Sequence, residues 1–311
     1  MKQQMQKSWI SNGNLIISGE YFVLTGAKAL AVPLKFGQSM RVEYIHNSGN
    51  TIRWRTNENG MTWFTADFNC DDLNITSTSD VGTAQGLQKL LKRIRSIKPA
   101  FFTKGSEYFI NCDIDFNLEW GWGSSSTLIV NLANYAGIDP FELNKLVSSG
   151  SGYDIAASLS PAPIFYQLKE GTHEINPVAF NPVFRKFIWF LYLGEKQNTS
   201  GSIEKYLRSV EKNRNLGPVI TGLTDMIAAE KNMEEFMRCI NEHEKIIAAA
   251  LNLTRIKEKY FNDFEGEIKS LGAWGGDFAM VISPLNEKII KQYFNAKGLE
   301  ILFGFDEIVK N

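Results

Sequence analysis

Residues 118–133, Leu-Glu-Trp-Gly-Trp-Gly-Ser-Ser-Ser-Thr-Leu-Ile-Val-Asn-Leu-Ala, decide how this chain is interpreted. Two glycines and a serine run pass directly into apolar residues at helical spacing. Gly121 and Gly123 let the backbone approach a ligand closely, because glycine has no side chain and tolerates positive φ. The serines fall on the first turn of the predicted helix, where N–H groups without intrahelical partners and the positive end of the helix dipole attract anions.

This segment predicts a loop that binds a triphosphate. Ser124 and Ser126 would contribute hydroxyls or amides to phosphate, and Ser125 would bind Mg²⁺, which prefers oxygen ligands. The alternative is an ordinary helix N-cap. The segment is not a Walker loop, because no lysine follows the second glycine, and the Rossmann spacing of three glycines is missing too.

A second glycine-rich stretch, Gly-Ala-Trp-Gly-Gly-Asp at 272–277, lies near the other end of the chain. It separates a helical pattern at 254–270 from an apolar, strand-like run at 278–282. A helix-to-strand turn needs one glycine, so three glycines in five residues predict a backbone that approaches a ligand. We expect this stretch to bind the cofactor through Gly272, Ala273, Gly275 and Gly276. A tight connection alone is the alternative.

Three motifs, in this order, resemble those of the GHMP kinases, a superfamily that includes galactokinase, homoserine kinase, mevalonate kinase and phosphomevalonate kinase. The first is Gly-Glu-Tyr-Phe-Val-Leu at 19–24, continuing through residues 26–34. The second, at 121–126, is similar to Gly-Leu-Gly-Ser-Ser-Ala with Trp122 in place of leucine. The third is similar to Gly-Ala-Gly-Gly-Gly with Trp274 replacing one glycine. Glu-Tyr in the first motif and Asp277 after the third are most similar to phosphomevalonate kinase.

Strands and helices that alternate without a regular βαβ cycle predict an α+β fold. The resemblance, which spans nearly the whole chain, implies two domains of the GHMP kinase type. The N-terminal domain, 1–175, would be like the second domain of ribosomal protein S5, and the C-terminal domain, 176–311, would be ferredoxin-like. It also implies ATP and Mg²⁺ as cofactors. The reaction would transfer the γ-phosphoryl group to a small alcohol or phosphorylated acceptor similar to mevalonate or phosphomevalonate.

Asp154 is the strongest candidate for a catalytic base. A Gly/Ser-rich turn at 149–153 delivers this acid into an apolar, small-residue stretch, where a partly desolvated carboxylate is functional or paired. Its position resembles that of the catalytic aspartate of mevalonate and phosphomevalonate kinases. The alternative is that Asp154 caps a helix beginning at Ile155. Glu20 resembles the glutamate of the family's first motif and is assigned to the catalytic site, with a surface turn acid as the alternative.

Substrate and metal ligands follow from the same resemblance. Relatives place a magnesium-binding glutamate where Glu142 stands, although a solvated first-turn glutamate is the plainer interpretation. They also carry a Ser-Thr pair where Thr199 and Ser200 follow an apolar strand. These two residues would hold substrate or phosphate oxygens, and Lys196 would supply positive charge to an anionic acceptor. The alternative is that residues 198–200 only cap the next helix.

Two positions depart from the pattern of the family. Relatives have Gly-Lys before the first strand, whereas this chain has Gly13-Asn14. Asn14 can donate a hydrogen bond to a phosphate, so we assign it to the substrate site, but it cannot lower the pKa of an aspartate through charge. Trp122 would wall the site or stack on adenine, with apolar packing as the alternative.

The composition agrees with a cytoplasmic metabolic enzyme. We expect a small-molecule substrate, and a monomer or homodimer. The net charge of −1 gives no case for nucleic acid or a membrane surface as partner. Cys70, Cys112 and Cys239 are scattered and lack CxxC spacing, which favours reduced thiols over disulfides or zinc. No apolar run approaches the roughly 20 residues that a membrane span needs.

The Asn14 substitution supports a competing hypothesis, a non-catalytic GHMP homologue that binds a nucleotide or metabolite. A decarboxylase of the same superfamily is a weaker possibility, because its first motif lacks the Gly-Glu pair. Periodicity and capping signals predict the remaining elements. We expect helices at 81–94, 125–137, 140–148, 217–230, 233–250, 254–270 and 286–297, strands at 164–168, 187–193, 278–282 and 299–304, and a loose polar segment at 169–182.

Overall fold

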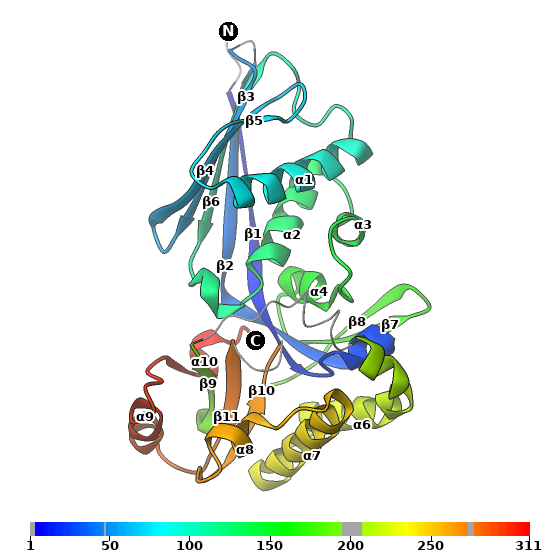
Figure 1. The fold of residues 1–311 in the computed structure, drawn as a ribbon, viewed down its shortest axis with the longest axis vertical. Coiled ribbons are helices and arrows are strands. Elements are labelled where there is room, and N and C mark those ends of the chain that lie inside the picture. Colours follow the sequence, from blue (N-terminus) through cyan, green and yellow to red (C-terminus); the bar gives the residue numbers. More distant parts are fainter. Residues whose placement is uncertain (1–3, 47, 195–206, 273–276) are drawn as a thin grey trace. The chain divides into compact units, whose positions relative to one another are not determined.

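The computed structural model describes residues 4–46, 48–194, 207–272 and 277–311. Strands and helices are mixed along the chain, which confirms the predicted α+β class (Figure 1). The chain divides into two compact units. Unit 1 comprises 1–13, 36–118 and 123–149, and unit 2 comprises 14–35, 119–122 and 150–311. The predicted boundary at 175/176 does not coincide with this division, because segments of the N-terminal half belong to unit 2.

Unit 1 contains a mainly antiparallel sheet in the order β5-β4-β3-β6-β2. Residues 38–46 of β2 run antiparallel to β6, whereas β3 runs parallel to β6. Buried and outward side chains alternate along β6, the period-2 pattern of a strand with one face on the core. The strands are β2 (Ala29–His46), β3 (Thr51–Glu58), β4 (Met61–Asn69), β5 (Ile75–Thr78) and β6 (Ser106–Ile114).

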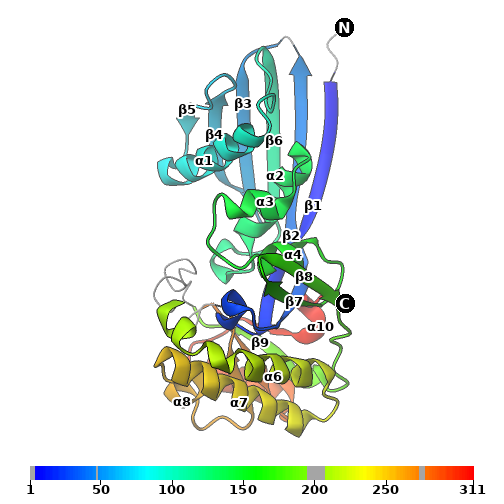
Figure 2. The same cartoon turned by 90° about the vertical axis from the view of Figure 1, so that its right-hand side faces the viewer.

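Three helices of unit 1 confirm the predictions made from capping and periodicity. They are α1 (Val81–Ile97), α2 (Ser124–Ala136) and α3 (Pro140–Lys145). The Asp80 carboxylate accepts the backbone N–H of Thr83 at 2.7 Å and so starts α1. Asp139 caps α3 in the same way, with Pro140 at the first helical position. α1 and α2 lie on the same face of the sheet (Figure 2).

Unit 2 begins with the end of β1 (Gln4–Ser18), the 3₁₀ turn η1 (Phe22–Thr25) and the start of β2. Residues 29–31 of β2 pair with β7 (Ile164–Lys169), which forms a hairpin with β8 (Thr172–Pro177). The segment 169–182, predicted to be a loose connection, therefore contains a strand. Glu170 and Gly171 both have positive φ, as a two-residue hairpin turn of type I′ requires. α4 (Tyr153–Leu159) packs against β7.

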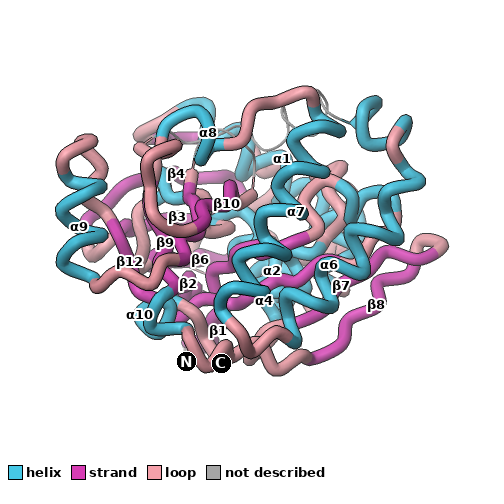
Figure 3. The backbone as a smooth tube through the Cα atoms, turned by 90° about the horizontal axis from the view of Figure 1, so that it is seen from below, coloured by secondary structure: helices cyan, strands magenta, loops and turns pink. Residues whose placement is uncertain are grey.

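The C-terminal part of unit 2 is an antiparallel sheet in the order β10-β11-β9-β12. Its strands are β9 (Ile188–Tyr192), β10 (Glu267–Ser270), β11 (Phe278–Ile282) and β12 (Leu302–Gly304). The helices are α6 (Gly217–Ala229), α7 (Met233–Leu251), α8 (Ile256–Tyr260), α9 (Glu287–Asn295) and α10 (Phe305–Ile308). α6 and α7 lie side by side, and α7 also packs on β10 (Figure 3).

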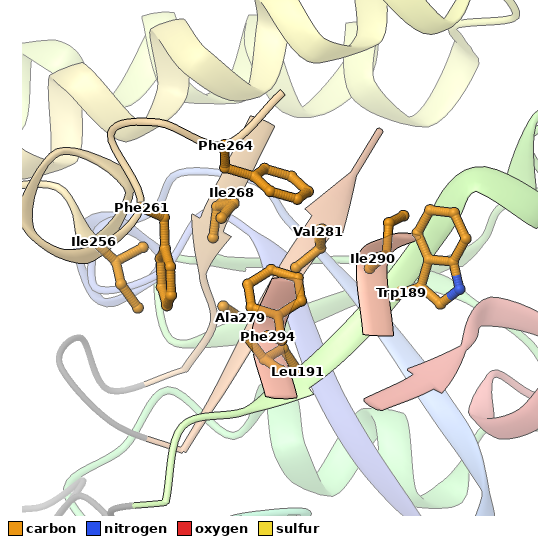
Figure 4. Close-up of a cluster of buried hydrophobic side chains, with 10 residues drawn as sticks. All are labelled: Trp189, Leu191, Ile256, Phe261, Phe264, Ile268, Ala279, Val281, Ile290 and Phe294. Atoms are coloured by element: carbon orange, nitrogen blue, oxygen red, sulfur yellow. The ribbon is translucent and has the colours of Figure 1, made fainter. Parts of the chain in front are cut away.

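One face of this sheet carries an apolar core in which strand residues meet aromatic residues from the flanking segments (Figure 4). β9 and β11 contribute alternate residues, as expected for one face of a pleated sheet. α9 contributes residues four apart, which lie on one side of a helix. The cluster comprises Trp189, Leu191, Ile256, Phe261, Phe264, Ile268, Ala279, Val281, Ile290 and Phe294.

The helix predicted at 254–270 is wrong over its second half. α8 ends at Tyr260, and residues 267–270 form β10, which pairs with β11. Gly266 stands before the strand with φ of 142°, and an added Cβ would lie 2.2 Å from the carbonyl oxygen of Ile282. All four residues of β10 are buried, including Lys269. In the sequence, Lys269 looks like a residue on the solvent-exposed face of a helix. Periodicity alone therefore did not predict this short buried strand.

Candidate active site

The loop before α2 has the backbone predicted for an anion-binding helix start. Gly121 and Gly123 have φ of 68° and 82°, in the left-handed region that favours glycine. Gly123 is the N-cap residue, and no side chain caps α2 in the described part of the chain. The Ser126 hydroxyl donates to the Gly123 carbonyl at 2.8 Å, and Ser125 is exposed. These features fit an anionic ligand on the first turn of α2, which includes Ser124.

The second and third glycine motifs meet within unit 2. A Cβ added at Gly121 would lie 2.8 Å from the carboxyl carbon of Asp277 and about as close to its oxygens. A Cβ added at Gly272, which has φ of 62°, would lie 4.0 Å from Oδ2 of the same carboxylate. Asp277 itself has φ of 50°, rare for a residue with a side chain. Ala273, Gly275 and Gly276, also predicted to bind the cofactor, lie outside the described residues.

Trp122 is buried, as its packing interpretation predicts. The indole is fully buried and packs on Trp120 and Phe278, with ring centroids 4.6 and 5.3 Å away. It contributes to the loop through its backbone, since its carbonyl accepts the N–H of Asn14 at 3.1 Å. The aromatic packing of Trp122 therefore supports the turn that precedes α2.

Asp154 lies in the first turn of α4. Gly152, with φ of 88°, is the N-cap residue of this helix, so Asp154 does not cap it. The carboxylate is half-buried, and burial raises its pKa, while the backbone N–H groups of Ile155 and of Asp154 itself lower it. A carboxylate with a raised pKa is a better proton acceptor than an exposed one, which suits the role of general base.

Tyr153 is a neighbour of the site that sequence reasoning missed. Burial raises the pKa of its hydroxyl, and the charges of Asp154, Glu20 and Asp277 raise it further. The hydroxyl therefore lies within electrostatic range of acids from the first motif, the third motif and α4. The only sequence signal was its position directly before Asp154.

Asn14 connects β1 to α4. The side chain is 4% exposed, and its amide nitrogen donates to the hydroxyl of Ser158 at 3.0 Å. Ser158 stands four residues after Asp154 on the same helix. The sequence assigned Asn14 to the substrate; in the structure its side-chain amide donates to α4 and its backbone N–H donates to the carbonyl of Trp122.

Glu20 belongs to a buried ionic cluster. It is 2% exposed and accepts a hydrogen bond from the Lys269 ammonium, which is itself fully buried. Glu244 Oε1 lies 3.6 Å from the same ammonium. His243 Nε2 accepts the N–H of Gly19 at 3.1 Å, so this ring is neutral with its proton on Nδ1. The 3.5 Å approach of His243 to Glu20 is therefore not an ion pair.

This cluster favours a structural role for Glu20, in place of the catalytic role predicted from sequence. Burial raises the pKa of Glu20, and Lys269 lowers it. Burial also raises the pKa of Glu244 to about 8, against the opposing effect of Lys269. One ammonium thus neutralises one carboxylate, and the second carboxyl is largely protonated at neutral pH. The sequence signal for Lys269 was a cation three residues before the third glycine motif.

The remaining predicted ligands have less defined surroundings. Glu142 is an exposed residue in the first turn of α3, which packs against α2. Lys196, Thr199 and Ser200 lie outside the described residues. Within the described ranges, no group of three or more His, Cys, Asp or Glu side chains could hold a metal ion.

Comparison with known proteins identifies the fold. No protein-family model matches the sequence, and no curated protein matches it. Among solved structures, L. major mevalonate kinase in complex with R-mevalonate is similar with a TM-score of 0.69 at 13% identity, over 98% of both chains. Streptococcus pneumoniae phosphomevalonate kinase in complex with phosphomevalonate and AMPPNP is similar at 0.68 and 16%, over 96% of this chain and 99% of that one. Lactococcus lactis galactokinase complexed with galactose is similar at 0.68 and 12%, over 98% and 93%.

The chain thus has the fold of the GHMP kinases, over nearly its whole length. The neighbours include a mevalonate kinase, a phosphomevalonate kinase and a galactokinase, so the resemblance predicted from three short motifs is confirmed at the level of the fold. Identities of 12–16% leave the reaction and the acceptor to be argued from the site.

Proposed function

We propose that this protein is an ATP- and Mg²⁺-dependent kinase that phosphorylates a small alcohol or phosphorylated acceptor of the mevalonate or phosphomevalonate type. The observation that carries the proposal is the close approach of Gly121 to Asp277. It joins residues of two glycine motifs that are 156 positions apart in a chain with the GHMP kinase fold. Because Gly121 has no side chain, a polyphosphate could approach the backbone N–H groups of this turn closely.

The chemistry requires few groups. The acceptor oxygen attacks the γ-phosphorus, the bond from that phosphorus to the bridging oxygen breaks, and its electron pair leaves with ADP. Asp154 takes the proton that the acceptor hydroxyl loses. Phosphate oxygens would be held by the first turn of α2, and Ser125 with Glu142 would hold the magnesium ion, which neutralises charge on the phosphates.

The proposed kinase acts in the cytoplasm. The three cysteines are free and buried, and burial raises the pKa of each thiol, so none has the character of a reactive thiolate. No helix among the described residues is both long and apolar enough to cross a membrane.

Asn14 supports one competing function, a homologue that binds a nucleotide without turnover. The relatives have a lysine at this position. In this chain the Asn14 side-chain amide donates a hydrogen bond to Ser158 instead. Among the described residues, no lysine or arginine charge contributes to the shifted pKa of Asp154. The carboxylate is therefore activated by burial instead of being held ionised by a cation.

A panel of acceptors separates the two functions. ADP release would be measured with mevalonate, phosphomevalonate, homoserine and galactose, in the presence of Mg²⁺, and binding of AMPPNP would be measured by calorimetry. The kinase proposal expects turnover with at least one acceptor and its loss in Asp154→Asn. Tight AMPPNP binding with no ADP release on any acceptor would favour the non-catalytic homologue.

A further inference from the structure

The helix that carries Asp154 begins at a glycine, Gly152, which has no side chain to cap it. Side chains cap α1, α3, α7 and α9, whereas in the described structure no side chain caps α4, whose N-cap residue is Gly152, or α2, α6 and α8. A glycine at this position is conformationally soft, and a missing cap side chain leaves the first turn less restrained. The turn at 151–153, which determines where Asp154 points, therefore needs support from another element.

Tyr166 of β7 provides a contact of this kind. Its side chain is fully buried, and its hydroxyl donates a hydrogen bond to the backbone carbonyl of Ser151. This bond fixes the peptide plane between Ser151 and Gly152, two residues before Asp154. Burial first, and the charge of Asp154 second, raise the pKa of Tyr166, so its hydroxyl stays protonated through neutral pH and remains a donor.

His173 of β8 determines the direction of this hydrogen bond. Its Nδ1 lies 2.7 Å from the Tyr166 oxygen. Tyr166 is paired with Ile175, so His173, two residues earlier, is on the same face of the hairpin. A carbonyl oxygen only accepts, so the single hydroxyl proton goes to Ser151, and the Tyr166 oxygen accepts from His173 Nδ1–H. His173 therefore carries a proton on Nδ1.

The other end of α4 is held in a similar way. Ser158 accepts the Asn14 amide at 3.0 Å, so one hydrogen bond from β1 restrains the last turn. α4 has only seven residues, too few to be stable without tertiary contacts. Its orientation is thus set by two side chains from neighbouring strands, one at each end.

We propose that Tyr166 and His173 are positioning residues that hold the turn 151–153 and thereby orient the Asp154 carboxylate. The catalytic consequence rests on the proposed kinase function. The physical claim, that the Tyr166 hydroxyl and the His173 Nδ1–H restrain the start of α4, is independent of the reaction. Both act through the turn 151–153, and neither is proposed to contact the reacting atoms.

The kinetic test uses three substitutions in the full chain, Tyr166→Phe, His173→Gln and His173→Asn. Asparagine keeps an N–H donor near the place of Nδ1, whereas glutamine moves it to the place of Nε2. We expect Tyr166→Phe and His173→Gln to lower kcat by about 10- to 100-fold, because small displacements of a catalytic group are costly. The KM for ATP should change less than about threefold, and His173→Asn should keep most of kcat. An unchanged kcat in Tyr166→Phe, or equal losses in both His173 variants, would overturn the catalytic role.

A matched control comes from His46 of unit 1, whose Nδ1 lies 3.1 Å from the hydroxyl of Ser106. His46→Gln removes a similar ring-to-hydroxyl contact and should leave kcat unchanged. Thermal unfolding of each variant shows whether it is folded. Tyr166→Phe removes only the hydroxyl oxygen, and we expect this variant to remain folded.

Amide hydrogen exchange tests the physical claim without any acceptor. The Ala156 N–H donates to the Gly152 carbonyl at 3.1 Å and reports on the first turn of α4. Its exchange should become faster in Tyr166→Phe and His173→Gln, with no change in α3, where Leu143 N–H donates to Asp139. Unchanged exchange at Ala156 would refute the positioning claim. If the wild type turned over no acceptor, the kinase proposal would fail while this measurement still decided whether Tyr166 holds the turn.

Discussion

Glu244→Gln should make the protein less sensitive to alkaline pH. Glu244 is fully buried on α7, where its Oε2 accepts the N–H of Ser270 at 3.3 Å and its Oε1 faces Lys269. Burial, the largest effect, raises its pKa from 4.5 to about 8. Glutamine has the same shape as the protonated acid and cannot ionise, so it preserves the neutral form at every pH.

The sign of the effect follows from proton linkage. Between pH 4.5 and about 8 the folded state holds a proton on Glu244 that the unfolded state has released. The contribution of Glu244 to the free energy of unfolding is therefore fully present below pH 4.5 and is lost as the pH rises towards 8. The shift from 4.5 to about 8, at about 1.4 kcal/mol per pH unit, gives an upper limit of about 5 kcal/mol. Coupling to Glu20 and Lys269 makes the real value smaller.

The assay is urea unfolding followed by tryptophan fluorescence, from pH 5 to pH 9, with wild type and variant compared at each pH. The difference should be small at pH 5 and should favour Glu244→Gln increasingly up to about pH 8. Glu242→Gln is the matched control, because Glu242 is exposed on the same helix. Parallel profiles for wild type and Glu244→Gln would show that Glu244 is already ionised in the folded state, and the description of the cluster would be wrong.

Three further predictions concern the candidate site. Asp154→Asn should lower kcat by about 10²- to 10⁴-fold with little change in AMPPNP affinity; wild-type turnover would remove Asp154 from its role as base. Gly121→Ala should weaken AMPPNP binding in calorimetry because its Cβ would meet the Asp277 carboxylate at 2.8 Å, whereas Gly137→Ala, at similar φ of 64° with no atom within 4 Å, should bind normally. Equal affinities for both variants would argue against a nucleotide site at Gly121. Asn14→Ala should lower the free energy of unfolding by about 1–3 kcal/mol, because it leaves buried partners unsatisfied; urea unfolding with no loss would contradict the role of Asn14 in holding α4.

Local signals predicted the elements that have strong caps or periodicity. α1 begins after Asp80 and α3 begins with Pro140, as the residues there indicate. The β8 strand was missed because its side chains are mostly exposed and polar. The hairpin turn before it has two residues with positive φ, and a glutamate such as Glu170 does not indicate that conformation in the sequence. β10 was missed because Lys269 appeared to be a solvated charge. In both cases pairing to a neighbouring strand outweighed local preference.

By itself, the sequence determined the glycine-rich turns, their order and the helix that follows the serines, because these depend on backbone freedom and capping within a few residues. Only the tertiary structure decided that Gly121 meets Asp277, that Glu20 is buried against Lys269, and that Tyr166 supports the turn before Asp154. These contacts join residues far apart in the chain. Whether a charged side chain is solvated, paired or protonated depends on the neighbours that folding brings to it, and local sequence does not record them.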